Sequence, residues 1–274
     1  MIYSGSKAID FLAEASTKTD PVASSHWRKY HSEFQFKDDK FQGLRGFGGN
    51  SKPYRGLRKF WHRVNQHSFR RMGRCFKHFN RIDNLASSIT TKQDRAYDLD
   101  VLRQSLSLAY FFEQLDAMNL PSKPMACVIG DGFATMTSLM ISSEFAKTVV
   151  LVNLTKTLLV DLWYLKTWMD EELFESSIDL VDNQESLLNL LSRKESDSVN
   201  SSSVVAIQAN NHELLQQLPI DFAVNIVSMQ EMNPSVIADY FLDLHTISSH
   251  RNIYFYCCNR EVKKLPDGTI TQFY

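Results

Sequence analysis

The sequence lacks the residue patterns that mark metal-binding and disulfide-rich proteins. Its four cysteines, Cys75, Cys127, Cys257 and Cys258, show no C-x-x-C spacing, and its eight histidines form no H-E-x-x-H motif. Cys257 and Cys258 are adjacent in a strand-like run, so their side chains point to opposite faces and cannot bind one zinc ion together. We therefore expect no metal site, and reduced, buried thiols in a cytoplasmic protein.

Long hydrophobic runs are missing as well. The N-terminal stretch "MIYSGSKAIDFLAEAS" places Asp10 and Glu14 where a signal peptide needs an unbroken apolar segment. The most apolar later region, 148–165, is interrupted by polar and charged residues, so it does not read as a membrane span. These patterns predict a soluble intracellular protein.

An excess of charge of one sign is also absent, because 30 Lys and Arg are balanced by 31 Asp and Glu. Residues 52–81 nevertheless hold ten Lys or Arg and no acid, whereas residues 170–197 hold nine acids and two bases. In 54–82 the bases alternate with apolar residues at spacings of three and four, which predicts a helical face that contacts the core. A nucleic-acid-binding surface is the alternative, since such surfaces interleave bases with aromatic residues.

From residue 125 onward, strand-like and helix-like segments alternate, which is typical of a parallel sheet covered by helices on both faces. We expect strands at 125–129, 148–153, 203–208, 221–228 and 252–258, and helices at 134–146, 155–169, 211–218 and 234–248. The acidic stretch 170–202 is expected to hold a helix and a mobile surface loop. A further helix is predicted over 98–118, with Asp98 as its N-cap. The predicted organisation is a mostly helical extension, 1–120, followed by a Rossmann-like domain, 121–274.

The stretch "CVIGDGFATMTS", residues 127–138, joins the first of these strands to a helix through Gly130 and Gly132. Glycines in this position let the backbone approach a nucleotide-like cofactor, and Asn153, 21 residues beyond Gly132, stands where such sheets place a ribose-binding side chain. A plain tight turn and an asparagine that merely ends a strand are the alternatives.

A second polar cluster follows the fourth strand, in "DFAVNIVSMQEMNPSV". Ser228, Gln230 and Glu231 lie just before a predicted helix, where reacting groups meet the cofactor in such sheets. Glu231 could equally be a surface acid that the helix dipole favours.

The segments "VIGDGFATMTSLM", "VVLVNLTKTLLVDL", "DFAVNIVSMQEMNPSVIADYF" and "FYCCNREVKKLPDGTITQF", with "LRGFGGN" upstream, resemble the sugar O-methyltransferases that depend on S-adenosylmethionine. The resemblance covers the region from about 125 to the end. It implies a class I methyltransferase fold and methyl transfer to a sugar hydroxyl. The positions that match the cofactor site are Gly130, Asp131, Gly132, Ala134, Thr135 and Asn153. Leu154 is also expected to bind the cofactor, and Asn210 and Asn211 are expected near the adenine.

For the chemistry, Glu231 is the expected general base, with Gln230 and Ser228 orienting the sugar and Asp131 or His212 as reserve bases. Val128 stands where these enzymes commonly have an acid, so contacts to the amino-acid end of the cofactor are expected from other groups. The chain also ends inside a strand-like run, "TITQFY", where the fold commonly adds two more strands.

The basic segment is expected to help shape the acceptor site, with Arg58, Arg63 and Arg71 facing an anionic group of the acceptor. Three alternatives to a sugar methyltransferase stay open: an NAD-dependent oxidoreductase, a nucleic-acid-binding protein, and a methyltransferase-like protein without activity. Thr135, where a dehydrogenase loop has its third glycine, argues against the first.

Overall fold

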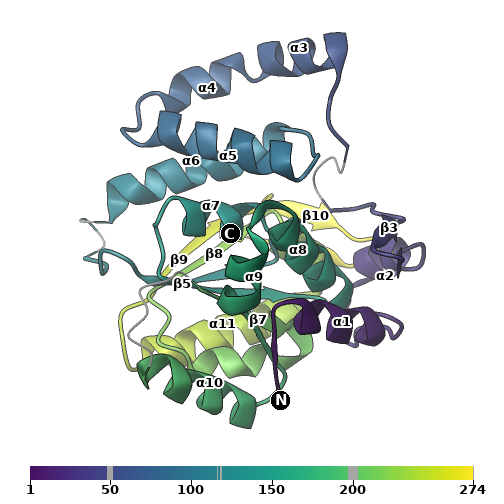
Figure 1. The fold of residues 1–274 in the computed structure, drawn as a ribbon, viewed down its shortest axis with the longest axis vertical. Coiled ribbons are helices and arrows are strands. Elements are labelled where there is room, and N and C mark those ends of the chain that lie inside the picture. The colour runs from purple at the N-terminus through teal and green to yellow at the C-terminus, as the bar shows by residue number, and fades with distance from the viewer. Residues whose placement is uncertain (48–51, 116, 118, 197–202, 274) are drawn as a thin grey trace.

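A computed structural model describes residues 1–47, 52–115, 117, 119–196 and 203–273. A seven-stranded sheet, in the order β1-β6-β7-β5-β4-β8-β9, lies at its centre (Figure 1). Its strands are β1 (Ile2–Ser4), β4 (Met125–Ile129), β5 (Thr148–Asn153), β6 (Ile178–Val181), β7 (Ser203–Gln208), β8 (Phe222–Ile226) and β9 (Tyr254–Cys258). All neighbouring pairs are parallel except β1 with β6. The predicted α/β class is therefore confirmed, with a mostly parallel sheet flanked by helices that is compatible with a Rossmann-like fold.

Side chains of the central strands alternate between two hydrophobic cores, as the pleat requires. In β4, Ala126 and Val128 belong to the core on one face, and Cys127 and Ile129 to the core on the other. Helices cover both cores: α1 (Ser6–Ala15), α5 (Phe79–Lys92), α6 (Leu99–Gln114), α7 (Thr135–Ser142) and α8 (Thr155–Trp168) on the first face; α10 (Gln184–Ser196), the 3-10 helix η1 (Ala209–Gln217) and α11 (Pro234–Ser248) on the second. Burial on both faces explains why these strands are apolar without interruption.

The predicted strands agree closely with the structure, since 125–129, 148–153 and 203–208 match β4, β5 and β7 at both ends. Asp98 caps α6 as expected, because its carboxylate accepts the backbone N–H groups of Asp100 and Val101. Asn233 precedes α11, and Pro234 starts it, but the Asn233 side chain makes no capping bond.

The prediction for residues 170–202 was wrong in part. Between α9 (Glu171–Ser177) and α10, the four residues of β6 are buried and pair with β7. The strand was missed because it has only four residues and is flanked by acidic residues on both sides. Residues 197–202 lie outside the described part of the chain.

The N-terminal region is joined to the sheet rather than separate from it. Strand β1 pairs with β6 at the sheet edge, and α1 packs on α8. Two small hairpins and further helices complete the chain: α2 (Ser25–His31), β2 (Gln35–Lys37), β3 (Lys40–Gln42), α3 (Gly56–Asn65), α4 (His67–Gly73), η2 (Met229–Glu231), β10 (Val262–Lys264) and β11 (Ile270–Gln272). The run "TITQFY" thus contributes β11 to a hairpin outside the central sheet. The division at residue 120 stays a prediction.

The expected core contact of the basic segment was wrong for its first helix. Helix α3 buries none of its residues, and Figure 1 places α3 and α4 at the end of the molecule farthest from the sheet, beyond α5 and α6. The thiols also differ from expectation, because Cys75 and Cys257 are exposed, although all four cysteines are free. Among the described residues, no helix is long and apolar enough to cross a membrane.

Candidate functional site

A cavity of about 950 Å³, open to solvent, lies at the carboxyl ends of β4, β5 and β8. The chain runs from β4 outward through β5 and later returns to β8 on the other side of β4, so the cavity lies at the switch point of the sheet. Open parallel sheets bind their ligands at this position. The predicted residues that line the cavity are Gly130, Asp131, Gly132, Thr135, Asn153, Leu154, Ser228 and Glu231.

The two glycines of the loop after β4 make room for other parts of the protein. Both have positive φ, +76° for Gly130 and +92° for Gly132, which favours glycine. A Cβ on Gly130 would overlap the Ser228 side chain, and one on Gly132 would lie 3.3 Å from the carbonyl oxygen of Phe47. The loop therefore approaches the end of β8 and the segment around Phe47 closely, while its backbone borders the cavity.

Two carboxylates occupy the N-terminus of α7, which follows this loop. Asp131 accepts the backbone N–H groups of Met136 (3.0 Å) and Thr137 (2.8 Å), and Asp161 on α8 accepts that of Ala134 (2.7 Å). Burial raises the pKa of both carboxyls, and for Asp161 the charge of Asp131 raises it further. Both oxygens of the Asp131 carboxylate accept hydrogen bonds from the start of α7, so Asp131 is unsuited to act as the alternative general base.

Arg95 is the buried cation next to this pair. Its guanidinium donates to the Phe133 carbonyl and to Thr135 Oγ1, both at 3.3 Å, and stacks on the Phe133 ring with its centroid 4.0 Å away. Burial lowers its pKa, and the nearby acids oppose that shift. The arginine connects the strand-to-helix loop to the segment between α5 and α6, and sequence reasoning missed it because no motif surrounds it.

Asn153 ends β5 and lines the cavity as predicted. Its Nδ2 donates to Asp161 (2.8 Å), and its Oδ1 accepts the backbone N–H of Leu154 (3.0 Å). An amide has a second N–H and a second lone pair, so one donor and one acceptor are left for a ligand. Leu154 and Ala209, on the neighbouring strand ends, supply apolar lining.

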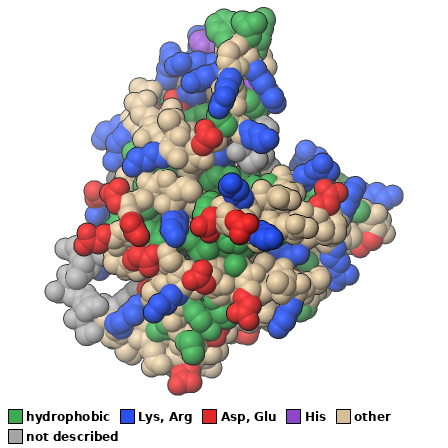
Figure 2. Space-filling model, turned by 45° about the vertical axis from the view of Figure 1, so that its right-hand side comes forward, with side chains coloured by type: hydrophobic (Ala, Val, Ile, Leu, Met, Phe, Trp, Pro, Cys, Tyr) green, Lys and Arg blue, Asp and Glu red, His purple; other side chains and the backbone are tan. Residues whose placement is uncertain are grey.

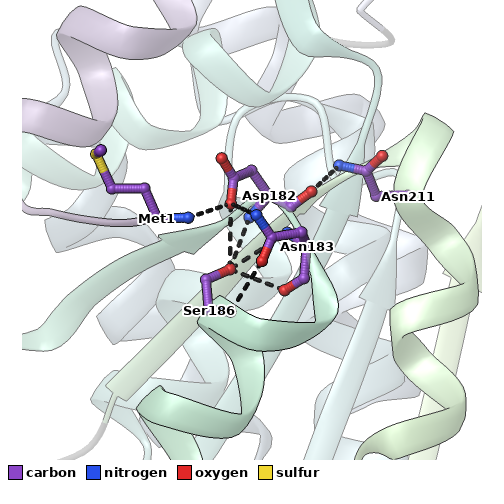
Figure 3. Close-up of polar contacts among 5 residues, drawn as sticks. All are labelled: Met1, Asp182, Asn183, Ser186 and Asn211. Atoms are coloured by element: carbon purple, nitrogen blue, oxygen red, sulfur yellow. Dashed lines mark hydrogen bonds and ion pairs between the residues drawn. The ribbon is translucent and has the colours of Figure 1, made fainter.

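The two asparagines expected near the adenine lie elsewhere. Asn210 is exposed, and the side chain of Asn211 donates to the carbonyl oxygen of Asp182 (2.9 Å), outside the cavity lining. Figure 3 shows the polar cluster around Asp182, which follows β6. The Asp182 carboxylate accepts a hydrogen bond from the amino group of Met1, and the Asn183 side chain accepts one from the backbone N–H of Ser186 at the start of α10. The error arose because η1 begins at Ala209 and turns the following side chains away from the cavity.

The residues after β8 separate into two groups. Ser228 lines the cavity and donates to the carbonyl oxygen of Ile129 (3.2 Å), whereas Gln230 is buried against Asn259 and Arg260 and lines no part of it. Gln230 is therefore misplaced for orienting a sugar. Val227, between β8 and Ser228, has φ +68°, a strained conformation for a β-branched residue, and such strain concentrates at functional sites.

Glu231 lines the cavity between a lysine and a histidine. Its Oε1 lies 2.6 Å from Lys263 Nζ on β10, and its Oε2 lies 3.3 Å from His26 Nε2 on α2. Elements far apart in the sequence thus meet at this carboxylate, which no spacing rule could show.

His212, the other residue predicted as a reserve base, lies elsewhere. Its ring forms a hydrogen bond with Asp243 (2.6 Å) and lines no part of the cavity, so it is not a reserve base.

Helix α6 supplies three polar lining residues that sequence reasoning missed: Asp100, Arg103 and Gln104. Asp100 pairs with Arg103 (2.6 Å), and burial raises its pKa, with further contributions from Asp98 and Glu231. Gln104 Oε1 is buried without a hydrogen-bond partner among the described residues. The only signal in the sequence was the N-cap Asp98, which marked where this helix starts and so where these three residues lie along it.

The N-terminal region closes another side of the cavity through Val22, Ser24, Trp27, Gly46 and Phe47. Phe47 bridges Trp27 and Phe133, with ring centroids 5.4 and 5.6 Å apart. The rest of "LRGFGGN", residues 48–50, lies outside the described residues. Arg58, Arg63 and Arg71 line no part of the cavity, so an acceptor role for them is not supported.

No group of three or more His, Cys, Asp or Glu side chains that could hold a metal ion occurs in the described part of the chain. Comparisons with models of protein families, with curated proteins and with solved structures gave no match.

Proposed function

We propose that the chain is an S-adenosylmethionine-dependent methyltransferase that acts on a sugar hydroxyl. The observation that carries the proposal is a switch-point cavity whose adjoining helix N-terminus is already occupied by the protein's own carboxylates. Dinucleotides place their pyrophosphate on free N–H groups at this position. Since Asp131 and Asp161 take three of these groups, the site favours a nucleoside cofactor without phosphate over NAD.

The residues present fit such a cofactor. Asn153 lines the cavity, and the free donor and acceptor of its amide suit a ribose hydroxyl. Leu154 and Ala209 offer an apolar surface for a purine. Gln104 Oε1, buried and unpaired among the described residues, requires a donor, which an ammonium group or a hydroxyl would supply.

The bound cofactor would supply a methyl group on a sulfonium, which is activated for transfer. The protein's part is then to hold the acceptor oxygen in line and to receive its proton. The polar side chains of Asp100, Arg103 and Gln104 form a hydrogen-bonding wall suited to sugar hydroxyls, and Ser228, which follows β8, also lines the cavity.

Two carboxylates that line the cavity are candidates to receive the proton. Glu231 is our first candidate, and its salt bridge to Lys263 holds it in position. Asp100 is the second, because burial makes its carboxyl a stronger base than a solvated aspartate. Both contact the cavity, in contrast to Gln230 and His212.

Titration calorimetry of the purified chain with S-adenosylmethionine, S-adenosylhomocysteine and NAD tests the cofactor. We expect binding of the first two. At a ligand concentration of roughly 100 Kd, either one should raise the free energy of unfolding by about 2.7 kcal/mol. Binding of NAD alone would refute the proposal. Transfer of a labelled methyl group to a panel of nucleotide sugars and glycans then tests the acceptor.

Matched asparagine variants make the binding test specific. Asn153→Ala removes an amide from the cavity and is expected to weaken S-adenosylmethionine binding by about 1–2 kcal/mol. Asn210→Ala removes an exposed amide outside it and is expected to change nothing. Equal losses in the two variants would place the cofactor elsewhere.

A further inference from the structure

Helix α3 projects from the body of the protein and is held there by α4. Three contacts attach α4 to the rest of the protein. Gly73 packs on Phe79 and Leu106, and Arg70 forms an ion pair with Asp83. Gln66, which precedes α4, donates to the Tyr97 carbonyl. No α3 residue is buried. The helix is therefore accessible to a binding partner along its whole length.

One face of α3 is apolar and is not covered by any other described part of the chain. Leu57, Phe60, Trp61 and Val64 recur at spacings of three and four residues and share a face, with 78, 60, 60 and 45% of their surfaces exposed. Phe69 and Met72 on α4 are also about half exposed. Figure 2 shows hydrophobic side chains gathered at the tip of the molecule, the end where Figure 1 places α3. A patch of this kind marks an interaction surface.

The flanks of the same helix are basic. Residues 52–81 contain ten Lys or Arg and no acid, and nine of these bases are exposed. Only Arg70 forms an ion pair among the described residues of this segment. In Figure 2, Lys and Arg side chains surround the base of the hydrophobic tip. The partner must therefore be anionic and must also accept apolar side chains.

These two requirements select the occupant. A second copy of the segment would bring like charges together, which is unfavourable. Nucleic acid would neutralise the bases and stack on the rings, but it offers nothing to Leu57 and Val64. An anionic phospholipid surface satisfies both, because headgroups bind the bases while Trp, Phe and Leu enter the boundary of the acyl chains.

We propose that α3 and α4 dock the protein on anionic phospholipid membranes, with α3 lying in the plane of the interface. Ten residues of helix measure about 15 Å, half of the hydrocarbon thickness, so the helix rests on the membrane and does not cross it. The proposal is independent of the chemistry in the cavity.

The test is flotation of the purified chain with vesicles of phosphatidylglycerol and phosphatidylcholine in equal parts, against vesicles of phosphatidylcholine alone. We expect binding to the first only, weakened by salt because the headgroup attraction is screened. Trp61 emission should shift to the blue on binding. Trp61→Phe keeps an apolar ring, and should remove that signal while retaining flotation.

Two sets of variants separate the contributions. Removing three charges in Arg58→Gln/Lys59→Gln/Arg63→Gln should weaken binding on the order of 100-fold, at about fivefold per charge. Phe60→Ser/Trp61→Ser should weaken it roughly tenfold or more with all charges kept. Leu242→Ser, at a site 60% exposed on α11, is the matched control and should bind as wild type. All the replaced residues are exposed, so the unfolding temperature reports whether the variants remain folded.

Equal binding to both vesicle types, or no binding to either, would overturn the proposal. Salt-sensitive binding of a duplex oligonucleotide without vesicle binding would assign the surface to nucleic acid instead. Self-association that disappears in Phe60→Ser/Trp61→Ser, again without vesicle binding, would assign it to a second copy.

Discussion

Gly130→Ala tests whether the end of β4 and the end of β8 are packed as closely as the structure indicates. The new Cβ would lie 2.7 Å from Ser228 Cβ and would overlap Ser228 Oγ. Alanine at φ +76° costs about 1–2 kcal/mol by itself. A displaced Ser228 loses its bonds with the Ile129 carbonyl and Asn225 Nδ2, at about 1 kcal/mol each. The expected destabilisation is therefore about 3–4 kcal/mol.

Gly268→Ala is the control for the backbone contribution. Gly268 has φ +93°, and its added Cβ would meet only Lys264, at 3.9 Å. We expect a loss of about 1–2 kcal/mol, which is the conformational cost without a steric one. Urea unfolding at fixed pH measures both variants.

A double-mutant cycle with Ser228→Gly isolates the contact. The single Ser228→Gly variant should lose about 2 kcal/mol. The double variant should lose no more than Gly130→Ala alone, because the hydrogen bonds of Ser228 are already lost in Gly130→Ala. The coupling is thus about 2 kcal/mol. Additive losses, or a Gly130→Ala loss equal to that of Gly268→Ala, would refute the proposed close approach.

Three further predictions concern the site and its surroundings. Glu231→Gln and Asp100→Asn should each bind S-adenosylmethionine normally, and the variant of the true base should lose about 10²-fold in turnover; wild-type rates in both would exclude them. Asn153→Ala should also lower stability by about 1–2 kcal/mol in urea unfolding, because Asp161 loses a donor; unchanged stability would contradict that bond. Burial, with Lys156 and His26 nearby, lowers the pKa of His31 from 6.5 to about 3, so folding stability should fall as the pH drops below about 6.5, by about 1.4 kcal/mol at pH 5.5. His31→Gln should remove that loss, and equal pH dependence in both proteins would refute it.

The central strands and the cavity loop could be read from local sequence. Burial on both faces demands continuous apolar residues, so β4, β5 and β7 stand out with sharp ends. The position of Gly130, Asn153 and Ser228 at strand ends follows from chain order, because parallel strands end at one edge of the sheet. The family resemblance and the activity that it implies stay predictions.

Patterns of spacing misled where burial depends on distant partners. The aromatic face of α3 has the periodicity of a core helix, and periodicity cannot tell whether a partner exists to cover it. The four residues of β6 are too few to show periodicity, and they become a strand only because β1 and β7 lie on either side.

The roles of the polar residues were decided by tertiary structure for a related reason. The sequence determined that Asp131 follows the first glycine, but only the fold brings its carboxylate to the α7 N-terminus, where it accepts the backbone N–H groups of Met136 and Thr137. Asp100, Arg103 and Gln104 line the cavity because the first turns of α6 lie beside it. Glu231 meets Lys263 and His26, which come from opposite ends of the chain. A local pattern specifies which groups a segment carries, whereas the direction of a side chain and its partners depend on contacts between residues far apart in the chain.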